Sequence, residues 1–121
     1  NYGVQFGLPG TFAPTASYSI LEKAVAIAKE KGVTYHVGDV LSSDAFYKKC
    51  NESELYKKMG ALAVEMETPA LYMNAAEAHK NALTILTISD HLFKSEELSA
   101  QERQTSFTDM MEIALKTAIQ L

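Results

Sequence analysis

The sequence predicts an α/β fold with a mixed, largely parallel central sheet and flanking helices. Two long segments, residues 15–31 and 99–118, carry apolar residues at helical spacing. Short apolar runs that are bounded by glycine or polar residues lie between these segments, as buried strands would. Helices and strands that alternate along a chain favour layered folds with parallel strands, so the pattern indicates this class.

The composition is that of an ordinary globular domain. The chain has 121 residues, of which 47% are hydrophobic and 21% are charged, and no apolar run is long enough to span a membrane. Its net charge of -4 disfavours a general nucleic-acid binder, which needs a concentrated basic surface, so a small-molecule ligand is expected. Cys50 is the only cysteine, which excludes an internal disulfide and suits a reducing cytoplasm. The chain begins at Asn1 without a signal-peptide pattern, so secretion is not supported and a longer parent protein is expected.

The first elements are a loop, a helix and a strand. Residues 1–14 contain three glycines and two prolines, so a loop or strand end is expected. The helix should end at Lys31, with Gly32 as its C-terminal glycine. Three hydroxyl residues are alternative N-caps for it: Thr15, Ser17 and Ser19. Residues 33–41 then alternate like a strand that runs into the polar residues 42–44.

The middle of the chain predicts a helix, a strand and another helix. Residues 44–60 are rich in lysine and expected to be largely helical, with Gly60 as the terminator. Residues 61–64 are short and apolar, as a buried strand would be. The next helix is expected from Pro69 to about Lys80, because proline is favoured in a first helical turn.

The last third predicts a buried strand and a long helix. Residues 82–89 form a nearly continuous β-branched run, which is typical of a strand covered on both faces. Residues 99–102 match a capping box, in which a serine and a glutamate satisfy backbone donors of the first turn. Apolar residues then follow at helical spacing: Phe107, Met110, Met111, Ala114, Leu115 and Ala118. Met110 and Met111 are expected to belong to the core.

Two carboxylates close the second predicted strand. A period of two would put Glu65 and Glu67 on one face with Met66 opposite, just before a helix that opens at Thr68. Acidic residues at the carboxyl end of a strand lie where α/β proteins gather ligand groups. The pair could grip hydroxyl groups or act on a glycosidic bond. Alternatively, one or both acids only favour the dipole of the following helix.

Asp90 and Arg103 are the other candidates for chemistry. Ser89, Asp90 and His91 are consecutive strand residues that point to opposite faces, so they cannot form a hydrolase triad. Asp90 is either a site acid or an ordinary strand-end carboxylate. Arg103 lies in the first turn of a helix and opposes its dipole, which hints that a carboxylate or ligand recruits it. The histidines lack metal-ligand spacing, so no metal site is expected.

Three motifs in order carry a resemblance to a known family. They are Val64-Glu65-Met66-Glu67-Thr68, Ser89-Asp90-His91-Leu92, and the run AQERQTSF over residues 100–107. At this spacing they closely resemble the bacterial hexameric type of purine nucleoside phosphorylase. The similarity runs along residues 1–121 but covers only the second half of that family's subunit. It therefore implies the C-terminal portion of a single nucleoside phosphorylase domain, with the N-terminal half outside this chain.

The resemblance implies phosphorolysis of purine ribonucleosides and deoxyribonucleosides to the free base and the sugar 1-phosphate. It makes Asp90 the general acid that protonates N7 of the departing purine, with Arg103 as its activating partner. Glu67 would bond the ribose hydroxyls. Five more residues would line the substrate site: Phe46, Val64, Glu65, Met66 and Ser89. Inorganic phosphate would be the co-substrate, and no cofactor or metal is implied.

Arg103 close to Asp90 would favour the ionised carboxylate and oppose proton donation. We therefore expect Asp90 to take up its proton before a helix or loop movement brings Arg103 in.

The family's phosphate-binding residues lie in its first half, and a neighbouring subunit lends further residues. This chain alone is therefore expected to be inactive, and a cytoplasmic homohexamer is implied for the whole enzyme. Two alternatives remain open. One is a related nucleoside hydrolase or uridine phosphorylase, which shares the general Met-Glu ribose motif. The other is a non-catalytic nucleoside-binding or assembly module that keeps the fold.

Overall fold

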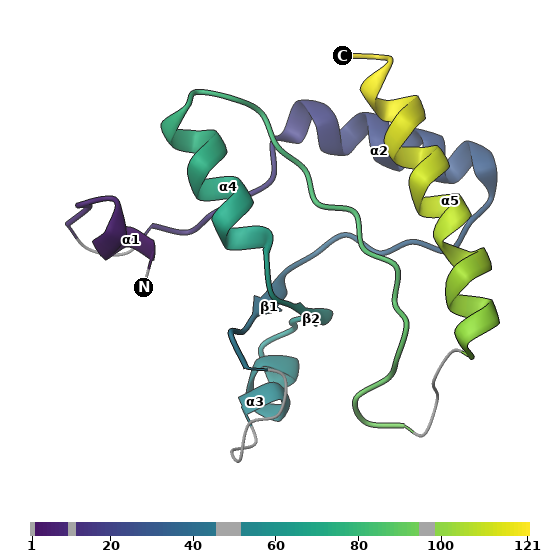
Figure 1. Ribbon diagram of the computed structural model, residues 1–121, viewed down its shortest axis with the longest axis horizontal. Helices are drawn as coiled ribbons and strands as arrows, with labels where there is room; N and C mark the ends of the chain where they lie inside the picture. Colours follow the sequence, from purple (N-terminus) through teal and green to yellow (C-terminus); the bar gives the residue numbers. More distant parts are fainter. Residues whose placement is uncertain (1, 10–11, 46–51, 95–98) are drawn as a thin grey trace. The chain divides into compact units, whose positions relative to one another are not determined.

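A computed structural model of the chain describes residues 2–9, 12–45, 52–94 and 99–121, apart from the side chains of residues 2, 3, 100 and 102–106. Helices and short strands alternate along the chain (Figure 1). In order, they are α1 (Tyr2–Gln5), α2 (Tyr18–Lys31), β1 (Val40–Ser42), α3 (Glu52–Lys58), β2 (Ala63–Glu65), α4 (Thr68–Glu77) and α5 (Ala100–Ala118). None of the helices in these ranges combines the length and apolarity that a bilayer crossing needs.

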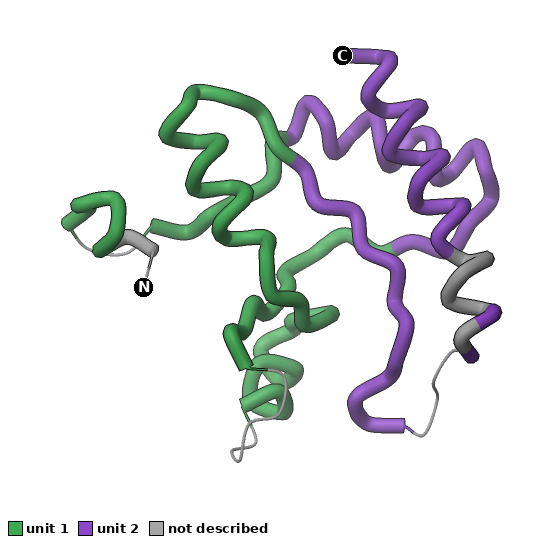
Figure 2. Tube along the Cα trace, in the orientation of Figure 1, with its two compact units in different colours: residues 1–17, 36–82 green, residues 18–35, 83–121 purple. Residues whose placement is uncertain are grey.

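The chain divides into two compact units (Figure 2). The first contains residues 1–17 and 36–82, and the second contains residues 18–35 and 83–121. Each unit combines segments that lie far apart in the sequence, so each depends on long-range contacts.

The first unit is built around a parallel pair of strands. β1 pairs with β2 so that Val40 lies opposite Ala63 and Ser42 opposite Glu65. Parallel strands need a crossover connection, and the chain between them contains α3. The N–H of Leu62 donates to the carbonyl of Asp39 at 2.8 Å, which extends the pairing before the strands begin. Helix α4 follows β2 after two residues, and α1 contacts α4.

The second unit is a helix pair with a small apolar core. α2 packs against α5 through four buried residues: Ala24, Ile27, Ala28 and Ile113. Val33, Leu83 and Ile85 pack against this cluster from the side. The buried hydroxyl of Thr117 donates to the carbonyl of Ile113 at 2.7 Å, so α5 satisfies this polar group within its own last turns.

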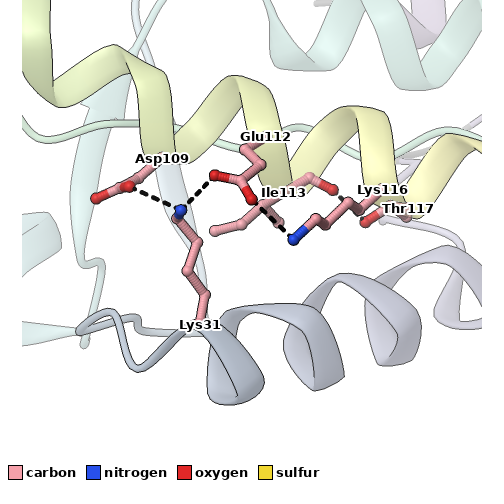
Figure 3. Close-up of polar contacts among 6 residues, drawn as sticks. All are labelled: Lys31, Asp109, Glu112, Ile113, Lys116 and Thr117. Atoms are coloured by element: carbon pink, nitrogen blue, oxygen red, sulfur yellow. Dashed lines mark hydrogen bonds and ion pairs between the residues drawn. The ribbon is translucent and has the colours of Figure 1, made fainter.

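Charged residues join the same two helices at one end of the contact (Figure 3). Lys31 Nζ lies 3.2 Å from Asp109 Oδ1 and also pairs with Glu112. Glu112 in turn pairs with Lys116 at 2.7 Å, one helical turn further along α5. Lys23 Nζ donates to the carbonyl of Gln120 at 3.1 Å. Lys31 at the C-terminal end of α2 thus contacts α5, and Lys23 in the middle of α2 contacts the chain just after α5.

The α/β class and the parallel strand pair are confirmed, and so is each long helix. α2 ends at Lys31 and is followed by Gly32 with φ +72°, a conformation that favours glycine. α3 ends just before Gly60, which has φ +97°. α4 stops at Glu77, before the expected Lys80, and His79 adopts φ 54°. Residues 2–5 form the short helix α1 where a loop or strand end was expected.

The predicted strands are too long. The first, expected over residues 33–41, is a strand only over 40–42, and the second, expected to begin at residue 61, is a strand only over 63–65. Residues 82–89 carry neither helix nor strand, although the run is β-branched. A strand exists only where a neighbouring backbone supplies a hydrogen-bonded ladder. The N–H of Ser17 donates to the carbonyl of Ala82 at 2.9 Å, but in the ranges covered by the structure no ladder continues over residues 83–89. Side-chain pattern alone therefore overestimated these strands.

The buried side of α5 also differs from the expectation. Met111 is 52% exposed and Leu115 is 68% exposed, so the prediction that both methionines belong to the core is wrong for Met111. The buried line of α5 runs through Ile113 and Thr117 instead. Residues four apart share one side of a helix, and α2 contacts that side.

Candidate functional site

The carboxyl ends of β1 and β2 meet at one edge of the first unit. Because the strands are parallel, Ser42 and Glu65 end them side by side. The N–H of Ser43 donates to the carbonyl of Glu65 at 3.0 Å, which continues the pairing past the last strand residues. Met66 and Glu67 follow directly, and α4 begins at Thr68. This edge holds four of the predicted site residues: Val64, Glu65, Met66 and Glu67.

The carboxylate of Glu65 caps the start of α4. Its Oε2 accepts the backbone N–H of Glu67 at 2.7 Å and the backbone N–H of Thr68 at 2.5 Å. Burial, the largest single influence, would raise the pKa of the Glu65 carboxyl. Polar contacts from Thr68, Ser42 and the Glu67 backbone together outweigh burial and hold that pKa below its ordinary value. Glu65 is therefore an ionised, partly buried helix cap.

Two buried side-chain oxygens at the junction of β2 and α4 lack a well-placed hydrogen-bond partner among the described residues. Glu65 Oε1 and Thr68 Oγ1 are buried, and neither has a hydrogen bond of good geometry within the described residues. Thr68 is only 6% exposed. Neither Ser42 nor Thr68 was given a site role from the sequence. The parallel register that places Ser42 beside Glu65 was the missing signal.

Glu67 occupies a different environment from Glu65. It is the N-cap residue of α4, with φ -122° and ψ -24°, yet its side chain makes no capping hydrogen bond. Its side chain is exposed, whereas Glu65 is partly buried. The expectation that both acids share one face of a strand is wrong, because β2 ends at Glu65 and the chain turns into α4. The two carboxylates therefore occupy different environments, one capping α4 and the other exposed.

Asp90 lies in the second unit at the end of the run from residue 82. The hydroxyl of Ser89 donates to Asp90 Oδ2 at 2.7 Å, and both residues are partly buried. The N–H of Phe93 donates to His91 Nδ1 at 3.2 Å, and the two rings meet edge to face with centroids 6.4 Å apart. Ser89 is thus engaged with a carboxylate, and His91 with the backbone that follows it.

Two predicted site residues are not placed by the structure. Phe46 lies outside the described residues. Arg103 falls in the first turns of α5, as expected, but its side chain is outside the described part of the chain. The pairing of Asp90 with Arg103 therefore stays a prediction, as does the capping role of Glu102 at the start of α5.

The sequence over residues 2–121 matches the family described as the Phosphorylase superfamily, and the chain belongs to that family. It is similar to several bacterial proteins that are each named "Purine nucleoside phosphorylase DeoD-type". The relative from Exiguobacterium sibiricum is 52% identical over 113 residues. Relatives from Clostridium perfringens and Geobacillus stearothermophilus are 55% identical over 111 residues and 49% identical over 108 residues.

These alignments cover nearly all of this chain but only part of each relative. They include 91% of the chain for the Exiguobacterium and Clostridium proteins and 89% for the Geobacillus protein. The corresponding shares of the relatives are 47%, 47% and 46%. The chain thus spans about half the length of the curated relatives it matches.

Proposed function

We propose that this chain is the purine-binding and ribose-binding portion of an enzyme that cleaves purine ribonucleosides and deoxyribonucleosides with inorganic phosphate. The products are the free base and the ribose or deoxyribose 1-phosphate. The observation that carries the proposal is the 52% identity over 113 residues to a relative named as a purine nucleoside phosphorylase. The different environments of Glu65 and Glu67 support the proposal. Glu65 caps α4, whereas the carboxylate of Glu67 makes no capping bond and remains available to a ligand.

Glu67 is the proposed ribose clamp. An ionised carboxylate accepts hydrogen bonds from two neighbouring hydroxyls, and such charge-assisted bonds are stronger than neutral ones. The exposed side chain of Glu67 has this capacity, because it does not cap α4. Met66, which is 39% exposed beside it, supplies an apolar surface for the sugar ring. In this proposal, Val64, Ser89 and Phe46 line the base pocket.

Asp90 is the proposed general acid. Cleavage of the glycosidic bond pushes electrons into the purine, so a proton delivered to N7 makes the base a better leaving group. The ribose develops positive charge at the same time, and a nearby carboxylate such as Glu67 stabilises that charge. Arg103 is the partner that approaches Asp90 after protonation. Phosphate, held elsewhere in the enzyme, attacks the anomeric carbon.

We further propose that the rest of the enzyme completes the fold and supplies the phosphate site. Apolar side chains that a finished fold would cover are exposed on this chain. On and just after α5 they include Met111, Leu115 and Ile119, which are 52%, 68% and 84% exposed. Leu86 and Ile88 of the β-branched run are 41% and 59% exposed. The proposed enzyme is a cytoplasmic homo-oligomer, a hexamer, and needs no cofactor besides its co-substrate phosphate.

The test uses the full-length protein that carries this sequence. Inosine is incubated with and without inorganic phosphate, and the products are followed by phosphorus NMR and by chromatography of the base. Hypoxanthine and ribose 1-phosphate should form only when phosphate is present. Free ribose formed without phosphate would indicate a nucleoside hydrolase, and uridine cleaved in preference to inosine would indicate a uridine phosphorylase. Tight inosine binding without turnover would leave a binding module as the function. Each of these three results contradicts the proposal.

A further inference from the structure

We infer that Glu65 is a positioning residue, which fixes Glu67 through the first turn of α4 and does not itself bind the nucleoside. This inference rests on the proposed function, in which Glu67 binds the ribose. It gives Glu65 and Glu67 different roles, whereas the sequence alone treats the two carboxylates as a pair.

The backbone donors at the start of α4 explain why a side chain is needed there. The first N–H groups of a helix have no partner within the helix. Glu65 Oε2 accepts two of these donors, the N–H groups of Glu67 and Thr68. Pro69, in the first turn, has no N–H to satisfy. The first backbone bond of the helix then runs from the N–H of Leu71 to the carbonyl of Glu67 at 3.2 Å.

The usual residue for this task is the N-cap, which here is Glu67. Its side chain makes no capping bond. An N-cap side chain accepts the N–H of the second or third helical residue, and the second one here, Pro69, has none. Glu65 instead takes the N–H groups of Glu67 and Thr68. A negative charge at a helix N-terminus also complements the helix dipole, so an ionised Glu65 stabilises the same turn electrostatically. The lowered pKa of Glu65 keeps it ionised at neutral pH. Glu67 makes no capping bond, so its carboxylate is available to a ligand.

The short link that contains Glu67 is held at both ends. On one side, the carbonyl of Glu65 accepts the N–H of Ser43 at 3.0 Å and is fixed by the β1–β2 pairing. On the other side, Thr68 is 6% exposed and its N–H is bound to the Glu65 carboxylate. Only Met66 and Glu67 lie between these two anchors. Loss of the carboxylate would free one anchor and let Glu67 shift.

The experiment is a double-mutant cycle in the full-length protein. The variants are E65A, E67A and the double variant, with inosine as the ribonucleoside and hypoxanthine as the matched ligand without ribose. A misplaced binding group costs up to about 100-fold, so E65A should raise the KM for inosine by about 10-fold or more. The dissociation constant for hypoxanthine should stay within about 3-fold of wild type, since the base does not use Glu67. The double variant should be no worse than E67A alone.

Backbone hydrogen exchange supplies a readout that does not depend on activity. In E65A, the amides of Glu67 and Thr68 should exchange faster than in wild type, whereas those of α5 should not change. Additive losses in the double variant, or an equal loss for inosine and hypoxanthine, would overturn the inference. Unchanged amide exchange in E65A would overturn it as well.

A conservative variant keeps the test valid if E65A does not fold. In E65Q the amide oxygen can still accept both N–H groups, so E65Q should retain markedly more inosine binding than E67Q. An E65Q loss as large as that of E67Q contradicts a positioning role. The proposed function fails separately, if the wild-type protein does not cleave inosine with phosphate. The amide-exchange result for E65A still decides the capping role in that case.

Discussion

Lys31 on α2 is joined to Glu112 on α5 by an ion pair, although 81 residues separate them in the sequence. Glu112 also contacts Lys116 and therefore lies between two lysines. Hydrogen bonds from Lys116 and then Lys31 lower the pKa of Glu112 from 4.5 to about 2. The same contacts raise the pKa of Lys31, with Glu112 as the largest influence. The pKa values of Lys31 and Glu112 thus depend in part on the packing of α2 against α5.

Replacement of Glu112 with Gln tests this link through its pH dependence. The folded-state pKa of about 2 lies below the ordinary 4.5, so the ionised carboxylate contributes stability above about pH 4.5. That contribution should disappear as the pH falls through about 2. The Tm difference between wild type and E112Q should therefore shrink with acidification, and also at high salt, because these groups are exposed.

The matched control is Glu22→Gln, which lies in the interior of α2 away from its last turn and shows no ion pair within the described residues. It should leave Tm nearly unchanged at every pH. A difference between wild type and E112Q that persists unchanged at low pH and high salt would show that Glu112 acts by packing and not by charge.

Gly32 provides a test of how α2 ends. Its φ of +72° lies in the left-handed region, and no atom comes within 4 Å of where a Cβ would be. Gly32→Ala should therefore destabilise the protein by about 1 kcal/mol through backbone strain alone. Gly32→Asn should cost less, since asparagine tolerates this conformation. Equal unfolding free energies for both variants in denaturant titrations would contradict this explanation.

Local signals predicted the two long helices, α2 and α5, well, because each of these helices is specified within its own residues. The sequence from the hydroxyl residues near Ser17 to Gly32 contains the start, the apolar spacing and the stop of α2. The same holds for α5, whose apolar spacing predicted a long helix. The strands depend on partners, and residues 82–89 show that a β-branched pattern is not sufficient without a paired backbone.

The sequence identified Glu65 and Glu67 as candidate site residues, but it did not show which of them caps the helix. The sequence singled out Glu65 and Glu67 and offered both a ligand-binding and a helix-dipole interpretation. The structure shows the helix-capping interpretation for Glu65, because β2 ends at that residue and the N–H groups of Glu67 and Thr68 donate to its carboxylate. A period of two could not reveal this turn, since it assumes that the strand continues.

Glu67→Gln tests the ribose clamp. A charge-assisted hydrogen bond is worth about 1.5–3 kcal/mol, so kcat/KM for inosine in the full-length protein should fall by about 10- to 100-fold. The fall should be much smaller for 2′,3′-dideoxyinosine, which lacks both hydroxyls. Steady-state kinetics on the two substrates measure this ratio. A similar fall on both would remove Glu67 from ribose recognition.

Asp90 is proposed to protonate the departing purine, and Asp90→Asn tests this role most directly. In the full-length protein, kcat for phosphorolysis of inosine is compared with kcat for 7-methylguanosine, whose base already carries the positive charge. Removal of a general acid costs about 100-fold or more, so D90N should lose at least that on inosine and keep most of its rate on 7-methylguanosine. Equal losses on both substrates would contradict the general-acid role of Asp90.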